Sequence, residues 1–137
     1  MKGKSMINYI ETRDFTKAQL QELFKSVSWL SANYPERLFK AMNNCETVFT
    51  AWDNDKLVGL VNAIDDGELT AYVHYLLVNP EHQGKGIATE LLDMVKEKYK
   101  DYLYVILVAE NKSLIDFYNK NGFEATPDTQ VMEIINK

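Results

Sequence analysis

The sequence predicts an α/β fold: a mixed, mostly antiparallel sheet of about seven strands with a central parallel pair, flanked by about four helices. Three features lead to this class. Apolar segments at 47–52, 56–64 and 69–78 are joined by tight polar turns, which predicts an antiparallel meander. A glycine-bearing loop and an amphipathic helix follow the third segment. The apolar run 102–108 then predicts a strand parallel to 69–78, reached by a right-handed crossover and covered on both faces.

Length and composition indicate one globular domain, residues 1–137, with residues 1–6 as a disordered lead. The net charge of −5 argues against a nucleic-acid partner and is compatible with a cationic small-molecule substrate. Cys45 is the only cysteine, so we expect neither an internal disulfide nor a metal site built on cysteines. The chain shows no apolar run of about eighteen residues and no signal pattern, so we expect a cytoplasmic protein without a membrane partner.

Local signals predict the elements before the meander. Residues 7–11 form a plausible first strand, and Thr16-Lys17-Ala18-Gln19 is a capping box that opens a helix. Pro35 suits the first turn of a second, short helix. The apolar faces of the two helices consist of Leu20, Leu23, Phe24 and Val27 in the first and Leu38, Phe39 and Met42 in the second.

The loop after the strand 69–78 is a predicted anion site. Pro80 ends the strand because proline has no N–H group to give to a ladder. Gly84 and Gly86 let the backbone approach a ligand closely and turn its N–H groups outward. The first turn of the following helix, from Ile87, adds free N–H groups and the positive end of the helix dipole. Residues 83–89 therefore suit a phosphate or pyrophosphate group.

The common nucleotide motifs do not fit this loop. A Walker loop requires G-x-x-x-x-G-K-[ST], but Lys85 is followed by Gly86. A dinucleotide fingerprint requires a third glycine where this chain has Thr89. The loop instead contains Gln83-Gly84-Lys85-Gly86-Ile87-Ala88, which resembles the coenzyme A pyrophosphate loop, Q/R-x-x-G-x-G/A, of the GNAT superfamily of N-acetyltransferases. The alternative is a strand-to-helix connection with no chemical role.

A second motif follows after the strand 102–108. Asn111 can cap a helix that contains Tyr118 and ends at Gly122, a natural left-handed position, and residues 123–125 and 130–135 are predicted as closing strands. Asn111, Tyr118 and Gly122-Phe123-Glu124 are similar to the N…Y-x-x-x-G-F-E motif at the end of GNAT domains. Two motifs in the right order are more specific than either one alone.

The resemblance implies an acetyl-CoA-dependent N-acetyltransferase that transfers the acetyl group directly to an amine, with acetyl-CoA as cosubstrate. Because homodimers are common in this superfamily, the resemblance also makes a homodimer the assembly to test. Cys45 lies outside both motifs, so nothing suggests a covalent intermediate. The alternative from another class is a catalytically silent acyl-CoA-binding or sensor domain. The residues that the resemblance assigns to the coenzyme are Leu76, Leu77, Val78, Gln83, Gly84, Lys85, Gly86, Ile87, Ala88, Thr89, Asn111 and Tyr118.

Individual roles follow from the resemblance with an alternative beside each. Tyr118 is either the general acid that protonates the coenzyme A sulfur or a packing residue. Asn111 hydrogen-bonds the pantetheine arm, caps its helix, or does both. Backbone N–H groups near Leu76 to Val78 are expected to stabilise the oxyanion, and Lys85 to add charge near phosphate.

His74 is the candidate general base, with a structural role as the alternative. Two-residue alternation places it on the same face as Tyr72, Leu76 and Val78, and its unperturbed pKa of roughly 6.5 suits a proton relay through water. Tyr72 is a weaker substitute for the same role. His82 is expected to be a solvated neighbour of the phosphates and at best an auxiliary contact.

For two further groups of residues, the sequence leaves two alternative roles open. Asp65, Asp66 and Glu68 either collect a cationic acceptor or form a solvated turn. Trp29, Tyr34 and Phe39 either line an acceptor pocket between the first two helices or belong to the core.

Overall fold

The structure is a computed structural model that describes residues 6–136. Apart from Met6, the predicted disordered lead lies outside this range. The chain divides into two compact units, Met1–Ile106 and Leu107–Lys137. In order, the elements are β1 (Ile7–Glu11), α1 (Lys17–Ser26), η1 (Leu30–Asn33), α2 (Pro35–Asn44), β2 (Thr47–Asp53), β3 (Lys56–Asp65), β4 (Thr70–Val78), η2 (Pro80–His82), α3 (Ile87–Lys98), β5 (Tyr104–Leu107) and α4 (Lys112–Lys120).

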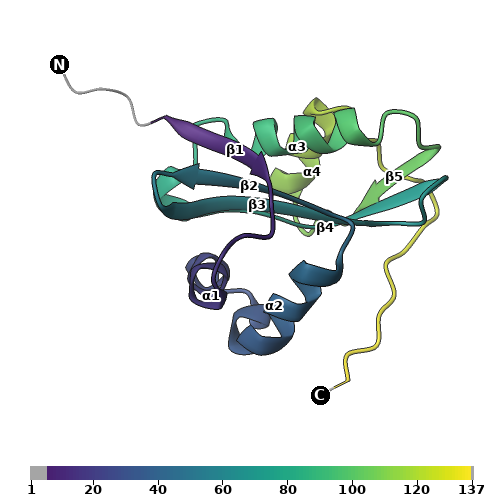
Figure 1. The fold of residues 1–137 in the computed structure, drawn as a ribbon. Helices are drawn as coiled ribbons and strands as arrows, with labels where there is room; N and C mark the ends of the chain where they lie inside the picture. The colour runs from purple at the N-terminus through teal and green to yellow at the C-terminus, as the bar shows by residue number, and fades with distance from the viewer. Residues whose placement is uncertain (1–5, 137) are drawn as a thin grey trace. The chain divides into compact units, whose positions relative to one another are not determined.

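The strands form one sheet in the order β1-β2-β3-β4-β5 (Figure 1). The first four are antiparallel neighbours, which confirms the predicted meander. Asp53 pairs with Lys56 across a two-residue turn in which Asn54 has a φ of 55°. The Tyr104 N–H donates to the Leu69 carbonyl at 2.9 Å, so β5 begins beside the start of β4. Because both strands then run away from the same point, the sheet is mixed, as predicted.

The strand count is a correction. The residues that the structure describes form a sheet of five strands, and the predicted closing strands 123–125 and 130–135 are not among them. Apolar composition suggested these strands, but a strand also needs a partner with which to share its hydrogen bonds. The large apolar side chains of the second segment are instead exposed, namely Val131, Met132, Ile134 and Ile135.

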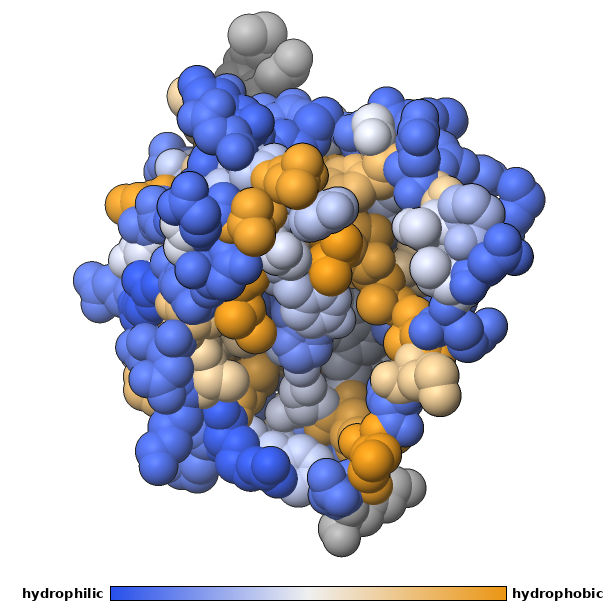
Figure 2. Space-filling model, turned by 90° about the vertical axis from the view of Figure 1, so that its right-hand side faces the viewer, coloured by the Kyte–Doolittle hydropathy of each residue, from blue (hydrophilic) through white to orange (hydrophobic). Residues whose placement is uncertain are grey.

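The strand β5 is also shorter and less covered than predicted. It spans Tyr104–Leu107 rather than 102–108, and it is the last strand in the order of the described sheet. Tyr104 and Ile106 are 56% and 49% exposed, so the expectation of coverage on both faces is wrong. A strand with one neighbour leaves apolar side chains at the surface. Figure 2 shows one face of the molecule, on which orange apolar groups lie among blue hydrophilic ones.

The helices α1 and α2 cover one face of the sheet within the first unit, and α3 covers the other (Figure 1). Thr16 forms the predicted capping box with Gln19, and Pro35 opens α2 as predicted. The core on this side combines apolar residues of both helices with those of the sheet. Its buried members are Phe15, Leu20, Leu23, Phe24, Ala32, Leu38, Met42, Cys45, Val48, Leu57, Leu60 and Leu77.

The helix α3 packs unusually close to β3 because of Gly59. A Cβ atom at this position would lie 3.0 Å from Ile87 Cγ2 and 3.2 Å from Leu91 Cδ1. Ile87 and Leu91 are both buried against the sheet. Gly59 thus fixes the first turns of α3 close to the sheet, and with them the loop that leads into the helix.

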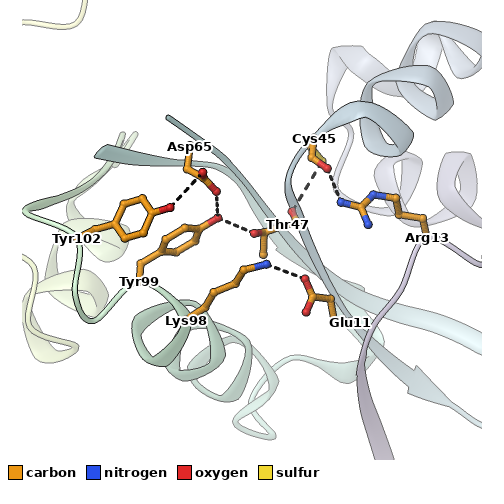
Figure 3. Close-up of polar contacts among 8 residues, drawn as sticks. All are labelled: Glu11, Arg13, Cys45, Thr47, Asp65, Lys98, Tyr99 and Tyr102. Carbon is orange, nitrogen blue, oxygen red and sulfur yellow. Dashed lines mark hydrogen bonds and ion pairs between the residues drawn. The ribbon is translucent and has the colours of Figure 1, made fainter. Parts of the chain in front are cut away.

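A polar network holds the other end of α3 (Figure 3). The buried Tyr99 hydroxyl lies 2.5 Å from Thr47 Oγ1 and donates to Asp65 at 2.7 Å. The Tyr102 hydroxyl donates to the second oxygen of Asp65 at 3.2 Å. Burial is the main cause that raises the pKa of Tyr99, so its phenol stays protonated as a donor.

This network changes the reading of the acidic turn. Asp65 accepts from two phenols, and Asp66 Oδ1 accepts from the backbone N–H groups of Glu68, Leu69 and Thr70 at 2.7–3.1 Å. Those backbone bonds lower the pKa of Asp66. Both carboxylates therefore stabilise the turn, and the hypothesis that Asp65, Asp66 and Glu68 collect a cationic acceptor stays a prediction.

Within residues 6–136, no helix has the length and apolar character needed to cross a membrane.

Candidate functional site

The segment between β4 and α3 is shaped by its own side chains. The Asn79 N–H donates to the Val58 carbonyl at 2.8 Å, and Asn79 Oδ1 accepts from the Glu81 N–H at 2.9 Å. The Gln83 side-chain amide donates to the Val78 carbonyl at 3.1 Å. These bonds fold the chain back on the end of β4 and start the loop at a defined point.

The two glycines of the loop are required by backbone conformation. Gly84 and Gly86 have φ angles of 81° and 82°, in the left-handed region that other residues rarely adopt. A Cβ atom added at either position would meet nothing within 4 Å. Space around both glycines is therefore open, as the approach of a ligand to the backbone requires.

The first turn of α3 has no side-chain cap among the described residues. Its N-cap is Gly86, whereas Thr16 and Asn111 cap α1 and α4 with their side chains. The first backbone bond of α3 runs from the Glu90 N–H to the Gly86 carbonyl, so the N–H groups of Ile87 to Thr89 precede the helical ladder. With the exposed Lys85 beside them, these donors form a site suited to an anion.

His82 is not the solvated residue that was expected. It is 7% exposed, and its Nε2 lies 3.0 Å from Asp53 Oδ2 at the end of β2. Its Nδ1 is buried and has no hydrogen-bond partner among the described residues. The two members are 29 residues apart, so spacing along the chain does not predict this pair.

The strand β4 carries a bulge at the predicted base. Val61 pairs with Leu76 and Ala63 with Val73, so Asn62 faces both His74 and Tyr75. The Tyr75 N–H donates to the buried Asn62 Oδ1 at 2.9 Å rather than to a backbone carbonyl. The side chain of Asn62 thus satisfies the backbone donor at the irregularity.

The bulge corrects the predicted face of His74. Its ring stacks on Tyr75 with centroids 3.9 Å apart and on Tyr72 at 5.5 Å. Tyr75 and Leu77 belong to the core beneath α1 and α2. His74 therefore shares a face with Tyr72, as expected, but not with Leu76 and Val78, because the extra residue shifts the alternation.

The surroundings of His74 favour a neutral imidazole. His74 is an exposed residue, but its ring is partly buried by its neighbours, and this burial lowers its pKa from the ordinary value of 6.5. The neighbouring Tyr75 is fixed by its hydroxyl, 2.7 Å from Ser31 Oγ, and by the Trp29 ring at 5.4 Å. An aromatic wall of Tyr72, His74, Tyr75 and Trp29 thus runs from β4 to the start of η1.

The three predicted aromatic residues, Trp29, Tyr34 and Phe39, lie in different surroundings. Trp29 belongs to this wall and also contacts Phe24, whereas Phe39 packs edge-on against Phe15 with the core. Tyr34 is 47% exposed and lies under the Arg37 guanidinium, 5.6 Å from the ring centroid. Of the three, Trp29 is the one that the structure connects to His74.

Asn111 and Tyr118 belong to the second unit. Asn111 Oδ1 accepts from the Leu114 N–H at 2.9 Å, which confirms its role as a cap. Tyr118 is buried, with its ring against Phe117 and Phe123. Burial, followed by the nearby charge of Glu110, raises the pKa of Tyr118, so its phenol keeps its proton at neutral pH. The packing role is thus present, and the acid role stays a prediction.

The end of α4 matches its expected form. Gly122 has a φ of 94°, the Gly122 N–H donates to the Asn119 carbonyl, and the Phe123 N–H donates to the Tyr118 carbonyl. This is a Schellman motif, in which glycine adopts the left-handed position at low cost. The G-F-E part of the second motif therefore has a structural cause.

Comparison with known proteins identifies the family. The profile of the Acetyltransferase (GNAT) family matches residues 7–123. The chain therefore belongs to the GNAT family of acetyltransferases.

Similar proteins agree with this assignment. A protein of Prochlorococcus marinus named as an uncharacterized ycf52-like N-acetyltransferase is 25% identical over 124 residues, 87% of this chain and 68% of that protein. A GNAT family acetyltransferase structure from Streptococcus pneumoniae TIGR4 has a TM-score of 0.84 and 28% identity, covering 96% of this chain and 99% of that one. An aminoglycoside acetyltransferase from an uncultured soil metagenomic sample, in complex with sisomicin, has a TM-score of 0.72 and 25% identity over 96% of each chain.

Proposed function

We propose that this protein is an N-acetyltransferase that transfers the acetyl group of acetyl-CoA directly to the amine of a small molecule. The observation that carries the proposal is the uncapped first turn of α3 behind two left-handed glycines, Gly84 and Gly86. A pyrophosphate group offers the charge and the acceptor oxygens that such donors need. Family membership makes coenzyme A the ligand to which this site is best matched.

The residues present fit this cosubstrate. The backbone N–H groups of Gly84 to Thr89 would hold the pyrophosphate, with Gln83 fixing the start of the loop and Lys85 adding charge. The backbone of Leu76 to Val78, at the end of β4, would hydrogen-bond the pantetheine arm and donate an N–H group to the thioester carbonyl oxygen. Asn111 and Tyr118 match the second motif and complete the set of proposed coenzyme residues.

The amine must lose a proton before it can attack. An alkyl amine with a pKa of roughly 10.4 is protonated at neutral pH, and freeing its lone pair costs about 4 kcal/mol. His74 is the proposed general base, acting through water, because its lowered pKa keeps it neutral and able to accept that proton. The aromatic wall beside it offers faces on which a cationic or apolar acceptor can lie.

The transfer itself is a direct displacement. The amine nitrogen forms a bond to the thioester carbonyl carbon, and a backbone N–H near the end of β4 stabilises the oxyanion. The carbon–sulfur bond then breaks, and Tyr118 donates its proton to the departing thiolate. After the attack, the nitrogen loses a second proton, which restores the phenol through solvent, while the proton first taken from the ammonium group by His74 is released to solvent. An acetylated amine and coenzyme A leave.

A covalent intermediate on cysteine has no support. Cys45 is 8% exposed in the core beneath α1 and α2. Burial is the largest effect on its thiol and raises the pKa, which opposes formation of the nucleophilic thiolate. Direct transfer is therefore the mechanism proposed.

Release of coenzyme A thiol in the presence of acetyl-CoA and a panel of amines tests the proposal. The panel should contain polyamines, aminoglycosides such as sisomicin, amino acids and a peptide with a free N-terminus, with acetyl-CoA alone as the blank for hydrolysis. We expect amine-dependent thiol release and an acetylated product of 42 Da added mass, roughly that of one acetyl group. Tight acetyl-CoA binding without release for any amine would favour the silent binding domain, which no present observation supports.

A further inference from the structure

His82 and Asp53 form a partly buried pair that joins two distant parts of the first unit. His82 is the last residue of η2, directly before Gln83, and Asp53 ends β2 at the turn into β3. Their side chains are 9% and 24% exposed, and the joining distance is 3.0 Å. Neither residue belongs to the sequence motifs or to the chemical steps described above.

The chemistry of the two side chains determines which of them donates the hydrogen bond. A carboxylate accepts hydrogen bonds, so the Nε2–H of His82 donates to Asp53 Oδ2. Nδ1 is then left buried without a partner among the described residues, which costs free energy. The imidazole is held in this place against that cost by the bond to Asp53, by the backbone bond from the His82 N–H to the Asn79 carbonyl at 2.8 Å, and by packing.

The range of this bond distinguishes it from the other side-chain hydrogen bonds of the loop. The side-chain bonds of Asn79 and Gln83 span two and five residues, so they shape the segment locally. The His82–Asp53 bond spans 29 residues and ties that segment to the β2–β3 turn. The backbone bond from the Asn79 N–H to the Val58 carbonyl also ties the segment to the sheet, but at its start, so the His82–Asp53 bond is a second long-range tie, placed directly before Gln83.

We propose that His82 and Asp53 are a positioning pair that holds the coenzyme loop in register with the end of β4. The inference rests on the proposed function, because it assumes that residues 84–89 bind the pyrophosphate. Without this bond, η2 can shift, and the backbone N–H groups that follow Gln83 no longer point toward the same ligand atoms. Displacement of aligned groups by about 1 Å is enough to lower binding or rate by large factors.

The effect should fall on coenzyme affinity rather than on turnover. Contacts to the pyrophosphate are the same in the ground state and the transition state, so their loss raises the dissociation constant and KM while kcat stays close to the parent value. A disturbance of the reacting groups would lower kcat instead. This split separates positioning of the loop from damage to the chemistry.

The test measures coenzyme A affinity by titration calorimetry and acetyl-CoA kinetics for the full chain. Asp53→Ala removes the acceptor of the bond at a partly exposed position, and His82→Leu removes the ring nitrogens but keeps an apolar side chain. Glu97→Ala is the matched control, since it removes one carboxylate from the exposed pair with Lys100. If His82→Leu fails to fold, as judged by its thermal melt, Asp53→Ala alone decides the outcome.

We expect each pair variant to raise the dissociation constant by about tenfold, with kcat within about twofold of the parent and the control unchanged. The double variant should lose no more affinity than the weaker-binding single variant, because one bond has been removed in each case. Parent-like affinity with a lowered melting temperature would overturn the proposal and leave the pair a purely structural tie. A loss confined to kcat would also overturn it.

Failure of the underlying function gives a different pattern. If the parent chain itself binds no coenzyme A, the proposed function fails and the positioning role fails with it. If the parent binds and the Asp53 and His82 variants bind equally well, only the positioning role is lost.

Discussion

Burial raises the pKa of Tyr118 and lowers that of His74, and at neutral pH each group is in the protonation state that its proposed role requires. A raised pKa keeps the phenol of Tyr118 protonated, as a proton donor requires. A lowered pKa keeps the imidazole of His74 neutral, as a proton acceptor requires. Two titratable groups whose pKa values are pushed apart are a common feature of acid–base catalysis.

Replacement of Tyr118 by phenylalanine tests the acid role. The ring contacts with Phe117 and Phe123 survive in Tyr118→Phe, so stability should change little. The coenzyme dissociation constant should also hold, because the loop supplies the pyrophosphate contacts. We expect kcat to fall by ~10²-fold, the lower end for general acid catalysis, because a thiol is a fair leaving group. Full turnover in steady-state kinetics would leave Tyr118 a packing residue.

The pH profile tests His74. A base works in its deprotonated form, so kcat/KM should rise as pH increases through the apparent pKa of His74. Because partial burial lowers that pKa, the rise should be centred below pH 6.5. His74→Ala should remove this limb and lower kcat/KM at neutral pH by ~10²-fold. Identical profiles for the variant and the parent, measured with the same amine, would assign His74 a structural role.

At the scale of elements, local signals predicted what local interactions determine. The capping box at Thr16, the proline of α2 and the C-terminal glycine of α4 all appear where their short-range chemistry placed them. The face of His74 was predicted wrongly because a bulge depends on how β4 registers with Asn62 on β3, and spacing along one strand does not encode it. The His82–Asp53 pair was missed for the same reason.

The N-terminus of α3 is the element on which coenzyme binding is proposed to depend. Gly86→Val places a β-branched residue at a φ of 82°, so the backbone must leave the left-handed region and reorient the N–H groups that follow. We expect the coenzyme A dissociation constant to rise by at least about tenfold, as measured by titration calorimetry.

A matched glycine keeps this test specific. Gly67 has a φ of 83° in the turn before β4 and, like Gly86, has open space around its missing Cβ. Gly67→Val should therefore carry a similar conformational cost without touching the loop. Equal affinities of the two variants for coenzyme A would contradict the phosphate assignment.

At the scale of the whole molecule, the family profile spans residues 7–123 and so includes parts of both compact units. The sequence predicted the meander and its order because turns and alternation are local. The sequence predicted about two strands more than the described sheet contains. An apolar run such as 130–135 becomes a buried strand only where a neighbouring strand or helix covers it, and the run itself does not encode that neighbour. Backbone conformation was most predictable where it demands a particular residue type, as at Gly84 and Gly86.

The acidic balance of the chain leads to the last prediction. A net charge of −5 creates a negative field that attracts a cationic acceptor and is screened by salt over about 10 Å at 0.1 M. We expect kcat/KM for a polyamine to fall several-fold between about 20 and 300 mM sodium chloride, and that for a monoamine of similar reactivity to fall less. The comparison is made at saturating acetyl-CoA, so that changes in coenzyme binding do not enter. Equal salt dependence for the two amines would mean that the charge of the molecule does not select its acceptor, and recognition would then lie in uncharged contacts such as those of the aromatic wall.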